Sequence, residues 1–260
     1  MAKFSLTDQQ TKDFARGGML RLPSYFSTKT MTPIAVAIWK DLDKRFGIKS
    51  EKRESWSKER PAQFQGLVRS GAFDALGEGL SALADAFLGE GTWMRPRHFC
   101  QPLVTFPSAH WDVPHSVWHV DLPPSDPETP LPCVRTFVLL EAVEAKGGGT
   151  GYVEGSHRVI ADLARQAPEE LRSTDVKHLL GNEPWFAALL SQGEEDRERR
   201  FMTEGSVVRD VSVHFKETIG DQGDVYVMHP AMLHTITPNI RERPRMMLGQ
   251  SFYRGSTRSD

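Results

Sequence analysis

The chain has 260 residues, of which 39% are hydrophobic and 25% charged, and its formal net charge is −2 at pH 7. This balance argues against a disordered chain, and no apolar run approaches the roughly 20 residues that a membrane-spanning helix needs. The near-neutral charge predicts no broad nucleic-acid surface. The two cysteines, Cys100 and Cys133, are too few for a disulfide framework, so we expect buried thiols.

The first residues, MAKFSLTDQQTKDF, are polar and lack the apolar core of an export signal, so we expect a cytoplasmic protein. Thr7 and Gln10 have the spacing of a capping box, which predicts that a helix begins here. Gly17 and Gly18 are expected to end that helix. The MLRLP that follows alternates in polarity and predicts a short strand.

Two further helices are predicted before the middle of the chain. Apolar residues recur at near-helical spacing from Pro33 to Phe46 and again from Phe73 to Leu88. The polar stretch SEKRESWSKERP between them predicts an exposed loop. The first third of the chain, about residues 1–92, is therefore expected to be mostly helical.

The texture changes near Arg97 to short β-like runs broken by proline and glycine: HFCQPLVTF, SVWHVDL, CVRTFVLLEAV, GTGYVEG, VVRDVSVHFKE, DVYVMH, LHTITP and MMLGQSFYR. Many short strands separated by turns favour a closed or double-layered β architecture such as a jelly roll. Residues 159–201 are helical in pattern and are expected to lie outside the barrel as an insertion that forms part of a substrate pocket. The prediction is one domain, mainly β with flanking α, with its β core at about 97–255.

Two His-x-Asp patterns lie close together, His110-Trp111-Asp112 and His119-Val120-Asp121. If SVWHVDL is a strand, His119 and Asp121 lie on one face of it because side chains alternate with period two. The upstream pair has prolines on both sides, which favour a loop. We therefore favour His119 and Asp121 as a candidate metal-binding pair.

A metal site needs a third ligand, and His229 and His234 in VMHPAMLHTITP are the candidates. Two histidines and one carboxylate form the facial triad that suits non-haem Fe(II) and leaves positions open for a cosubstrate and dioxygen. A catalytic zinc site uses the same residue types. The ligands alone therefore leave the metal open.

Arg245 lies eleven positions after His234. The planar fork of an arginine holds a carboxylate with two parallel hydrogen bonds, and 2-oxoglutarate has a distal carboxylate to be held. On composition alone, Arg241, Arg243 and Arg245 are equally well explained as a basic surface turn.

Over nearly its whole length the chain resembles the phytanoyl-CoA dioxygenase family of Fe(II)- and 2-oxoglutarate-dependent oxygenases. LTDQQTKDFARGGMLRLPSYFS resembles the opening helix and strand of that family, and WHVD resembles its first metal motif. GGGTGYVEGSHR resembles its glycine stretch ending in Gly-Ser-His. GDVYVMHPAMLHTITPN followed by Arg245 resembles its second metal motif and cosubstrate arginine. The four motifs occur in the family's order, which gives the resemblance its weight.

The resemblance implies a double-stranded β-helix, the cupin-like jelly roll, in which His119, Asp121 and His234 bind Fe(II). It implies that Arg245 binds the far carboxylate of 2-oxoglutarate, and that dioxygen is the second cosubstrate. His229 would then be structural.

Three other residues receive expectations from the same resemblance. His157 is expected to belong to a turn rather than to the metal site. Gln101 and Thr150 are expected to be polar contacts to 2-oxoglutarate, although Thr150 and the glycines before it also suit a tight turn.

The implied activity is oxidation, by default hydroxylation, of a C–H bond in a small organic metabolite, with release of succinate and CO₂. Halogenases of the family lack the carboxylate ligand, whereas Asp121 is present here. Val120, Phe137 and Thr235-Ile236 depart from the common family residues and leave the substrate open. The alternatives are a cupin-like zinc hydrolase that does not use 2-oxoglutarate and a non-catalytic binding protein. Neither nucleic acid nor membrane is an expected partner, and the oligomeric state is open.

Overall fold

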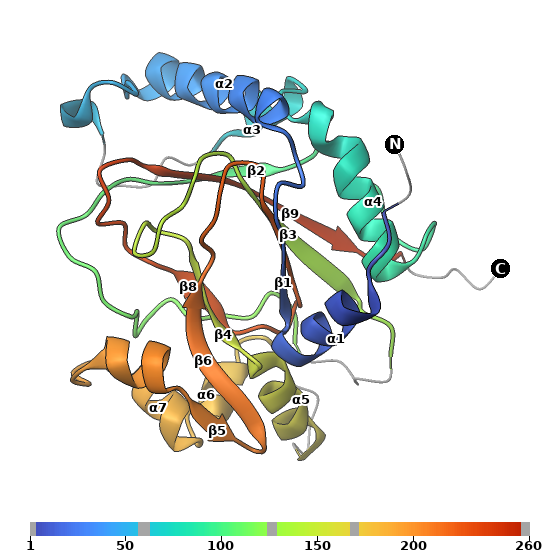
Figure 1. Ribbon diagram of the computed structural model, residues 1–260, viewed down its shortest axis with the longest axis vertical. Helices are drawn as coiled ribbons and strands as arrows, with labels where there is room; N and C mark the ends of the chain where they lie inside the picture. The colour runs from blue at the N-terminus through green and yellow to red at the C-terminus, as the bar shows by residue number, and fades with distance from the viewer. Residues whose placement is uncertain (1–3, 57–62, 124–128, 167–171, 256–260) are drawn as a thin grey trace.

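The computed structural model of the chain describes residues 4–56, 63–123, 129–166 and 172–255. Two antiparallel sheets form its centre, with helices at both ends (Figure 1). The larger sheet contains, in spatial order, β1 (Met19–Leu22), β7 (Val225–Met228), β3 (Cys133–Leu139), β9 (Arg245–Tyr253) and β2 (Gln101–Thr105). The smaller sheet contains β5 (Ser206–Val208), β6 (Val211–Glu217), β4 (Thr150–Glu154) and β8 (His234–Ile236).

The two faces of β3 show how the larger sheet is packed. Phe137 and Leu139 point inward, where they form a buried cluster with Tyr152 of β4 in the smaller sheet. Val134 and Val138 point outward and pack in the core beneath the helices. Because successive side chains of a strand face opposite sides, one strand serves both cores. Two packed antiparallel sheets with flanking helices confirm the expected jelly-roll class.

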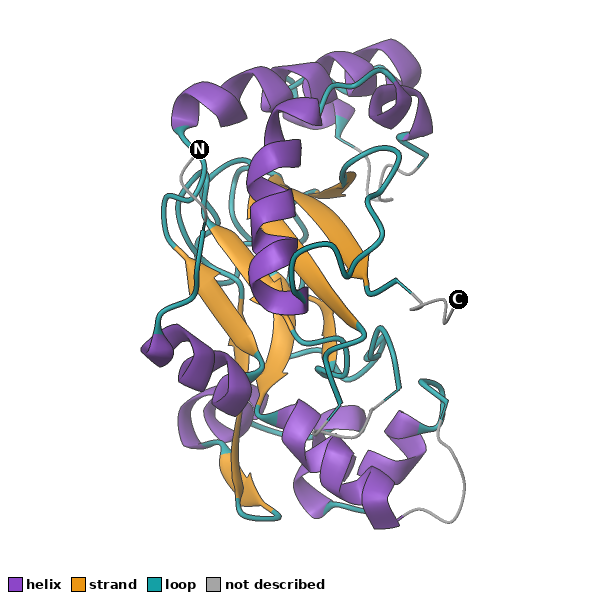
Figure 2. Cartoon of the chain, turned by 90° about the vertical axis from the view of Figure 1, so that its right-hand side faces the viewer, coloured by secondary structure: helices purple, strands orange, loops and turns teal. Residues whose placement is uncertain are grey.

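The N-terminal helices cover the outer face of the larger sheet (Figure 2). They are α1 (Asp8–Gly17), α2 (Thr28–Phe46), α3 (Gln65–Arg69) and α4 (Gly77–Leu88). The start of α1 is as predicted, because Thr7 and Gln10 form a capping box and Gly18 ends the helix in the left-handed region at φ 77°.

Two predicted helix boundaries were wrong. α2 begins at Thr28 rather than Pro33, because the Ser27 side chain accepts a hydrogen bond from the backbone N–H of Thr30 and caps the helix one turn earlier. The predicted helix from Phe73 to Leu88 is divided into a 3₁₀ turn, Asp74–Leu76, and α4. The predicted exposed loop over residues 50–61 lies partly outside the described residues, and its described part contains a short 3₁₀ turn at Arg53–Ser55.

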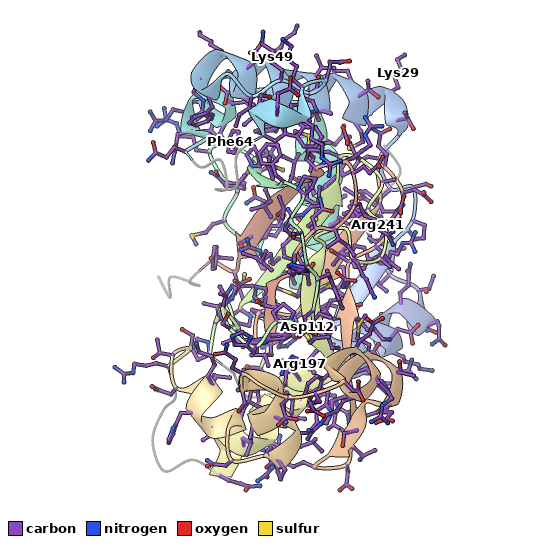
Figure 3. All side chains as sticks on the ribbon, turned by 90° about the vertical axis from the view of Figure 1, so that its left-hand side faces the viewer. Lys29, Lys49, Phe64, Asp112, Arg197 and Arg241 are labelled. Carbon is purple, nitrogen blue, oxygen red and sulfur yellow. The ribbon has the colours of Figure 1, made fainter. Side chains whose placement is uncertain are left out.

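The segment after β4 is helical, as its pattern indicates. It contains α5 (Ser156–Gln166), α6 (Val176–Leu180), α7 (Pro184–Leu190) and a π-helix (Arg199–Glu204). Trp185 and Phe186 are buried together with Phe201, so these aromatic side chains pack the helices onto the barrel. Arg197, in this segment, forms a long ion pair with Asp112 in the loop before His119 (Figure 3).

The expected strand SVWHVDL is absent, which is a correction. Its backbone forms only an isolated bridge, between His119 and His234, and Val117 adopts a left-handed φ of 61°. Alternation nevertheless survives locally, because Trp118 and Val120 are buried in the core while His119 and Asp121 point away from it. No helix in the described ranges is long and apolar enough to cross a membrane.

Candidate metal centre

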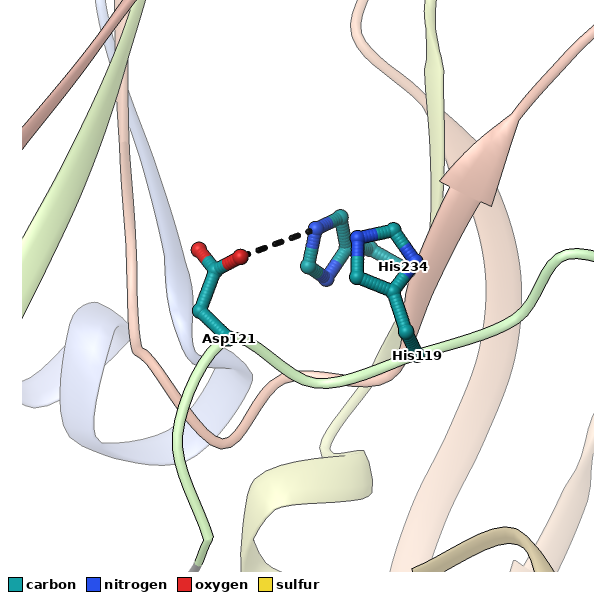
Figure 4. Close-up of side chains that lie close together, drawn as sticks. All are labelled: His119, Asp121 and His234. Atoms are coloured by element: carbon teal, nitrogen blue, oxygen red, sulfur yellow. Dashed lines mark ion pairs between the residues drawn. The ribbon is translucent and has the colours of Figure 1, made fainter. Parts of the chain in front are cut away.

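Three side chains from two distant segments converge beside β8, with His119 exposed, Asp121 half-buried and His234 buried (Figure 4). His234 is the first residue of β8, and His119 and Asp121 come from the loop that pairs with it. One ligand atom from each residue lies within 4.8 Å of the other two. The imidazole centroids of His119 and His234 are 4.1 Å apart, and His234 Nε2 is 3.7 Å from Asp121 Oδ1. The sequence-predicted triad is thus brought together.

Backbone carbonyls orient both imidazoles. His119 Nδ1 lies 3.1 Å from the carbonyl oxygen of Val117, and His234 Nδ1 lies 2.9 Å from that of Met232. A carbonyl accepts a hydrogen bond only from a protonated Nδ1, which leaves the lone pair on Nε2. Hydrogen-bonded histidines of this kind are the usual metal ligands in proteins.

Asp121 carries the clearest sign of an expected cation. Its backbone N–H donates to the carbonyl of Pro230 at 2.9 Å, which fixes the turn. Its Oδ2 is buried and has no hydrogen-bond partner among the described residues, and Arg135 Nη1 is 3.6 Å away. A buried carboxylate oxygen without a hydrogen bond is costly, whereas a bound cation satisfies it. The donor set of two imidazoles and a carboxylate fits Fe(II), and it also fits zinc.

Burial, and to a smaller extent the neighbouring His119, lowers the pKa of His234 to about 4 against the opposing effect of Asp121. His234 is therefore neutral at neutral pH. A metal binds imidazole only in that form, so the site is prepared for a cation without first having to release a proton from His234.

A cavity of about 170 Å³ adjoins His119 and His234. Its other walls are formed by Pro102, Leu103, Val104, Thr105, Arg135, Phe137, Thr150, Thr235, Ile236 and Arg245. Apolar side chains thus alternate with a few polar groups. Such a mixture is typical of small-molecule sites.

Arg245, the first residue of β9, is only 5% exposed, whereas Arg241 and Arg243 are exposed. Its Nε donates to the carbonyl of Gly148 at 2.6 Å and its Nη1 to that of Leu103 at 2.9 Å. These bonds hold the guanidinium in the cavity wall. The alternative of a basic surface turn therefore does not apply to Arg245.

Thr150 and Gln101, the two residues expected as further contacts to 2-oxoglutarate, lie in different surroundings. Thr150 begins β4 and lines the cavity. Gln101 begins β2 opposite Gly249, and its side chain is exposed. The glycines before Thr150 serve close backbone approach, because a Cβ at Gly149 would lie 2.4 Å from the carbonyl oxygen of Thr218.

The other candidate histidines lie elsewhere. His229 and His157 lie together with ring centroids 4.7 Å apart, and His157 is buried while His229 is half-buried. His157, in the first turn of α5, has its Nε2 3.1 Å from the carbonyl oxygen of Ala15. The upstream His110 and Asp112 are exposed and do not belong to the metal group. Among the two His-x-Asp patterns, the structure selects the second.

Arg135 was missed by the sequence analysis. It lies on β3, two residues before Phe137, and reaches the same cavity beside Asp121. The available signal was the one charged residue in the mostly apolar CVRTFVLL.

Comparison with solved structures identifies a similar fold in several proteins. AviO1 from Streptomyces viridochromogenes is 17% identical, with 95% of each chain covered and a TM-score of 0.58. HygX from Streptomyces hygroscopicus, solved with nickel and 2-oxoglutarate, is 15% identical over 97% of this chain and 89% of HygX, with a TM-score of 0.57. SnoN, a non-haem α-ketoglutarate-dependent epimerase from nogalamycin biosynthesis, is 14% identical over 97% of this chain and 86% of SnoN, with a TM-score of 0.54. No family model matches the chain, and the search of curated proteins gives no match.

Proposed function

We propose that this chain is a non-haem Fe(II)- and 2-oxoglutarate-dependent dioxygenase, formed as one domain, that hydroxylates a C–H bond of a small organic molecule. The observation that carries the proposal is the convergence of His119, Asp121 and His234 beside a cavity into which Arg245 is fixed. The similar fold of HygX, a protein solved both with iron and with nickel and 2-oxoglutarate, supports it. The order of the sequence motifs favours the phytanoyl-CoA dioxygenase type.

The three ligands have separate roles in holding the metal. His119 and His234 present Nε2, because their Nδ1 atoms are engaged by backbone carbonyls. Asp121 presents the carboxylate and lowers the net charge of the bound ion. Iron, when bound together with 2-oxoglutarate and dioxygen, supplies the oxidising chemistry that releases succinate and CO₂.

We assign Arg245 to the distal carboxylate of 2-oxoglutarate. Its planar fork suits a carboxylate, and the carbonyls of Gly148 and Leu103 fix the plane of that fork before any ligand arrives. Thr150 offers a hydroxyl on the same wall. Gln101 remains a prediction, and its exposed side chain places it away from the cavity wall.

The apolar part of the wall has its own task. Leu103, Phe137 and Ile236 line the cavity beside the metal ligands. Side chains of this kind exclude water, which strengthens the charge interactions inside and protects reactive species from solvent. They also suit the hydrocarbon portion of an organic substrate.

Anaerobic titration with Fe(II) and then 2-oxoglutarate tests the proposal. The expected result is a weak visible metal-to-ligand charge-transfer band that requires both additions. His119→Ala should abolish the band, and His110→Ala, which changes an exposed histidine outside the group, should keep it. A folded, iron-loaded protein without the band would instead favour a cupin-like metalloprotein that does not use 2-oxoglutarate.

A further inference from the structure

Arg135 is a second cation at the metal site, and its environment differs from that of Arg245. On β3 it pairs with Ser251 of β9 and with Met228 of β7, and its side chain is 28% exposed. Its Nη1 lies 3.6 Å from Asp121 Oδ2 and 3.4 Å from Ser251 Oγ. The guanidinium also lies over the ring of Phe137, with 5.3 Å between its central carbon and the ring centroid.

These contacts leave the guanidinium poorly satisfied. A distance of 3.6 Å is too long for a hydrogen bond, and 3.4 Å is at the limit of one. The Nε of Arg135 is buried without a hydrogen-bond partner in the part of the chain that the structure describes. Since an arginine has five N–H donors and no acceptor, the long ion pair with Asp121 leaves Arg135 with donors for a further anion.

The strand beside Arg135 leaves room for its head group. A Cβ added at Gly249 would lie 3.4 Å from Arg135 Nη2 and 3.2 Å from Leu103 Cδ1. The backbone of β9 at Gly249 therefore lies close beside the guanidinium without blocking it.

The charges around the cavity point in the same direction. The described residues that line the cavity include two arginines, Arg135 and Arg245, and no carboxylate. The wall of the cavity therefore carries positively charged side chains, and such a wall attracts an anionic ligand.

Arg135 and Arg245 are well separated along the sheet. Arg135 pairs with Ser251, six residues along β9 from Arg245, which corresponds to about 20 Å of strand. Both side chains nevertheless reach the cavity from these separate origins. Arg245 is already assigned to the cosubstrate, so Arg135 is placed to meet a different ligand.

We propose that Arg135 receives the anionic group of the primary substrate, so that the enzyme acts on small organic molecules that carry a carboxylate. This inference rests on the proposed function. The guanidinium orients the substrate by gripping its acid group at the end of the cavity beside Asp121. Arg135 is thus a residue that determines specificity, while iron and 2-oxoglutarate are held by other groups.

Matched ligand pairs test this inference in the anaerobic protein loaded with Fe(II) and 2-oxoglutarate. Benzoate, cinnamate and octanoate are each compared with the corresponding carboxamide by calorimetry, which requires no turnover. For at least one pair we expect the acid to bind ten times more tightly or better, and the charge-transfer band to persist. Arg135→Gln should reduce that preference to below twofold and leave the 2-oxoglutarate dissociation constant within twofold.

Two further variants make the result specific. Arg135→Lys should keep part of the preference, because it retains the charge but loses the planar fork. Arg243→Gln, which changes an exposed arginine of the neighbouring turn, should keep all of it. Thermal unfolding of each variant shows whether the fold is intact.

The inference is overturned if no acid binds better than its amide, or if the preference survives in Arg135→Gln. It is also overturned if the acid displaces 2-oxoglutarate, or if Arg135→Gln weakens 2-oxoglutarate binding tenfold, because Arg135 would then serve the cosubstrate. A charge-transfer band that never forms in the unmodified protein contradicts the proposed function itself. The two failures are therefore distinguishable.

Discussion

His119 and His234 are hydrogen-bonded to each other through their backbones in both directions. The N–H of each donates to the carbonyl of the other at 3.0 Å. In an antiparallel pair of this kind the two side chains emerge on the same side of the backbone, with Cα atoms about 5.5 Å apart. Two candidate metal ligands that are remote in the chain are thus aligned by one bridge.

The first prediction concerns metal-dependent stability. A ligand that binds only the folded protein stabilises it by about 2.7 kcal/mol at a concentration one hundred times its dissociation constant. Fe(II), added without oxygen, should therefore raise the melting temperature, and a chelator should reverse the gain. Asp121→Ala should remove the gain because it deletes the only carboxylate of the described metal group.

Asp112→Ala is the matched control for this prediction. Asp112 belongs to the upstream His-x-Asp pattern, and its side chain is 65% exposed. The variant should retain the full stabilisation by metal. If Asp112→Ala lost the gain and Asp121→Ala kept it, the assignment of the triad would be wrong.

Arg245→Lys should raise the dissociation constant for 2-oxoglutarate about tenfold to a hundredfold, with little change in iron affinity. A hydrogen bond to a charged group contributes about 1.5–3 kcal/mol, and lysine does not reproduce the fork. The variant should also lower the unfolding free energy, because the carbonyls of Gly148 and Leu103 lose a donor. The readouts are the charge-transfer titration and calorimetric iron binding, with Arg241→Lys as the control. An equal loss of both affinities would contradict the assignment.

Arg197→Met should destabilise the protein by about 3 kcal/mol, the range for breaking a buried polar network. Its guanidinium donates to the carbonyls of Val113 at 2.8 Å, Pro114 at 3.1 Å and Leu189 at 2.6 Å. These bonds join the helical segment to the loop that leads to His119. Urea unfolding measures the loss, and weaker iron binding should accompany it.

The control for Arg197 is Arg199→Met. Arg199 is 65% exposed and makes only surface ion pairs, which are typically worth less than about 1 kcal/mol. The unfolding free energy of the Arg199→Met variant should therefore differ little from that of the unmodified protein. If both variants lost a similar amount of unfolding free energy, the hydrogen bonds of Arg197 to buried carbonyls would contribute no more to stability than surface ion pairs do.

Acidification should destabilise the metal-free protein through His157 and His229. Burial is the main reason that the pKa of His157 is lowered to about 4 and that of His229 to about 3, and the neighbouring His157 contributes to the shift of His229. The unfolded chain protonates near pH 6.5, so this stability is present above that pH and is lost as the pH falls towards 4. Each histidine contributes up to about 1.4 kcal/mol per pH unit in that window.

His157→Gln should flatten the pH dependence of the unfolding free energy between pH 6.5 and 5. The exposed His178→Gln should leave it unchanged. Urea titrations at three pH values within this window give the slopes. If the unmodified protein and His157→Gln gave identical slopes, His157 would not be the source of the pH dependence.

Local patterns were sufficient to predict much of the fold. The capping box of Thr7 and Gln10 depends only on neighbouring residues, and so does the alternation in MLRLP that predicted β1. The metal motif was recognised for the same reason, although the strand invoked to choose between the two His-x-Asp pairs does not exist. The choice of His119 agrees with the structure because burial of Trp118 and Val120 preserves the alternation without a ladder.

What the sequence by itself determined is which residues are candidates for the site, because motif order and side-chain type are local properties. Only the tertiary structure decided how they meet: the bridge between His119 and His234, the burial of Arg245, and the approach of Arg135 to Asp121. Each of these depends on strand pairing between segments far apart in the chain. Such pairing is set by the packing of the whole barrel rather than by any short stretch of residues.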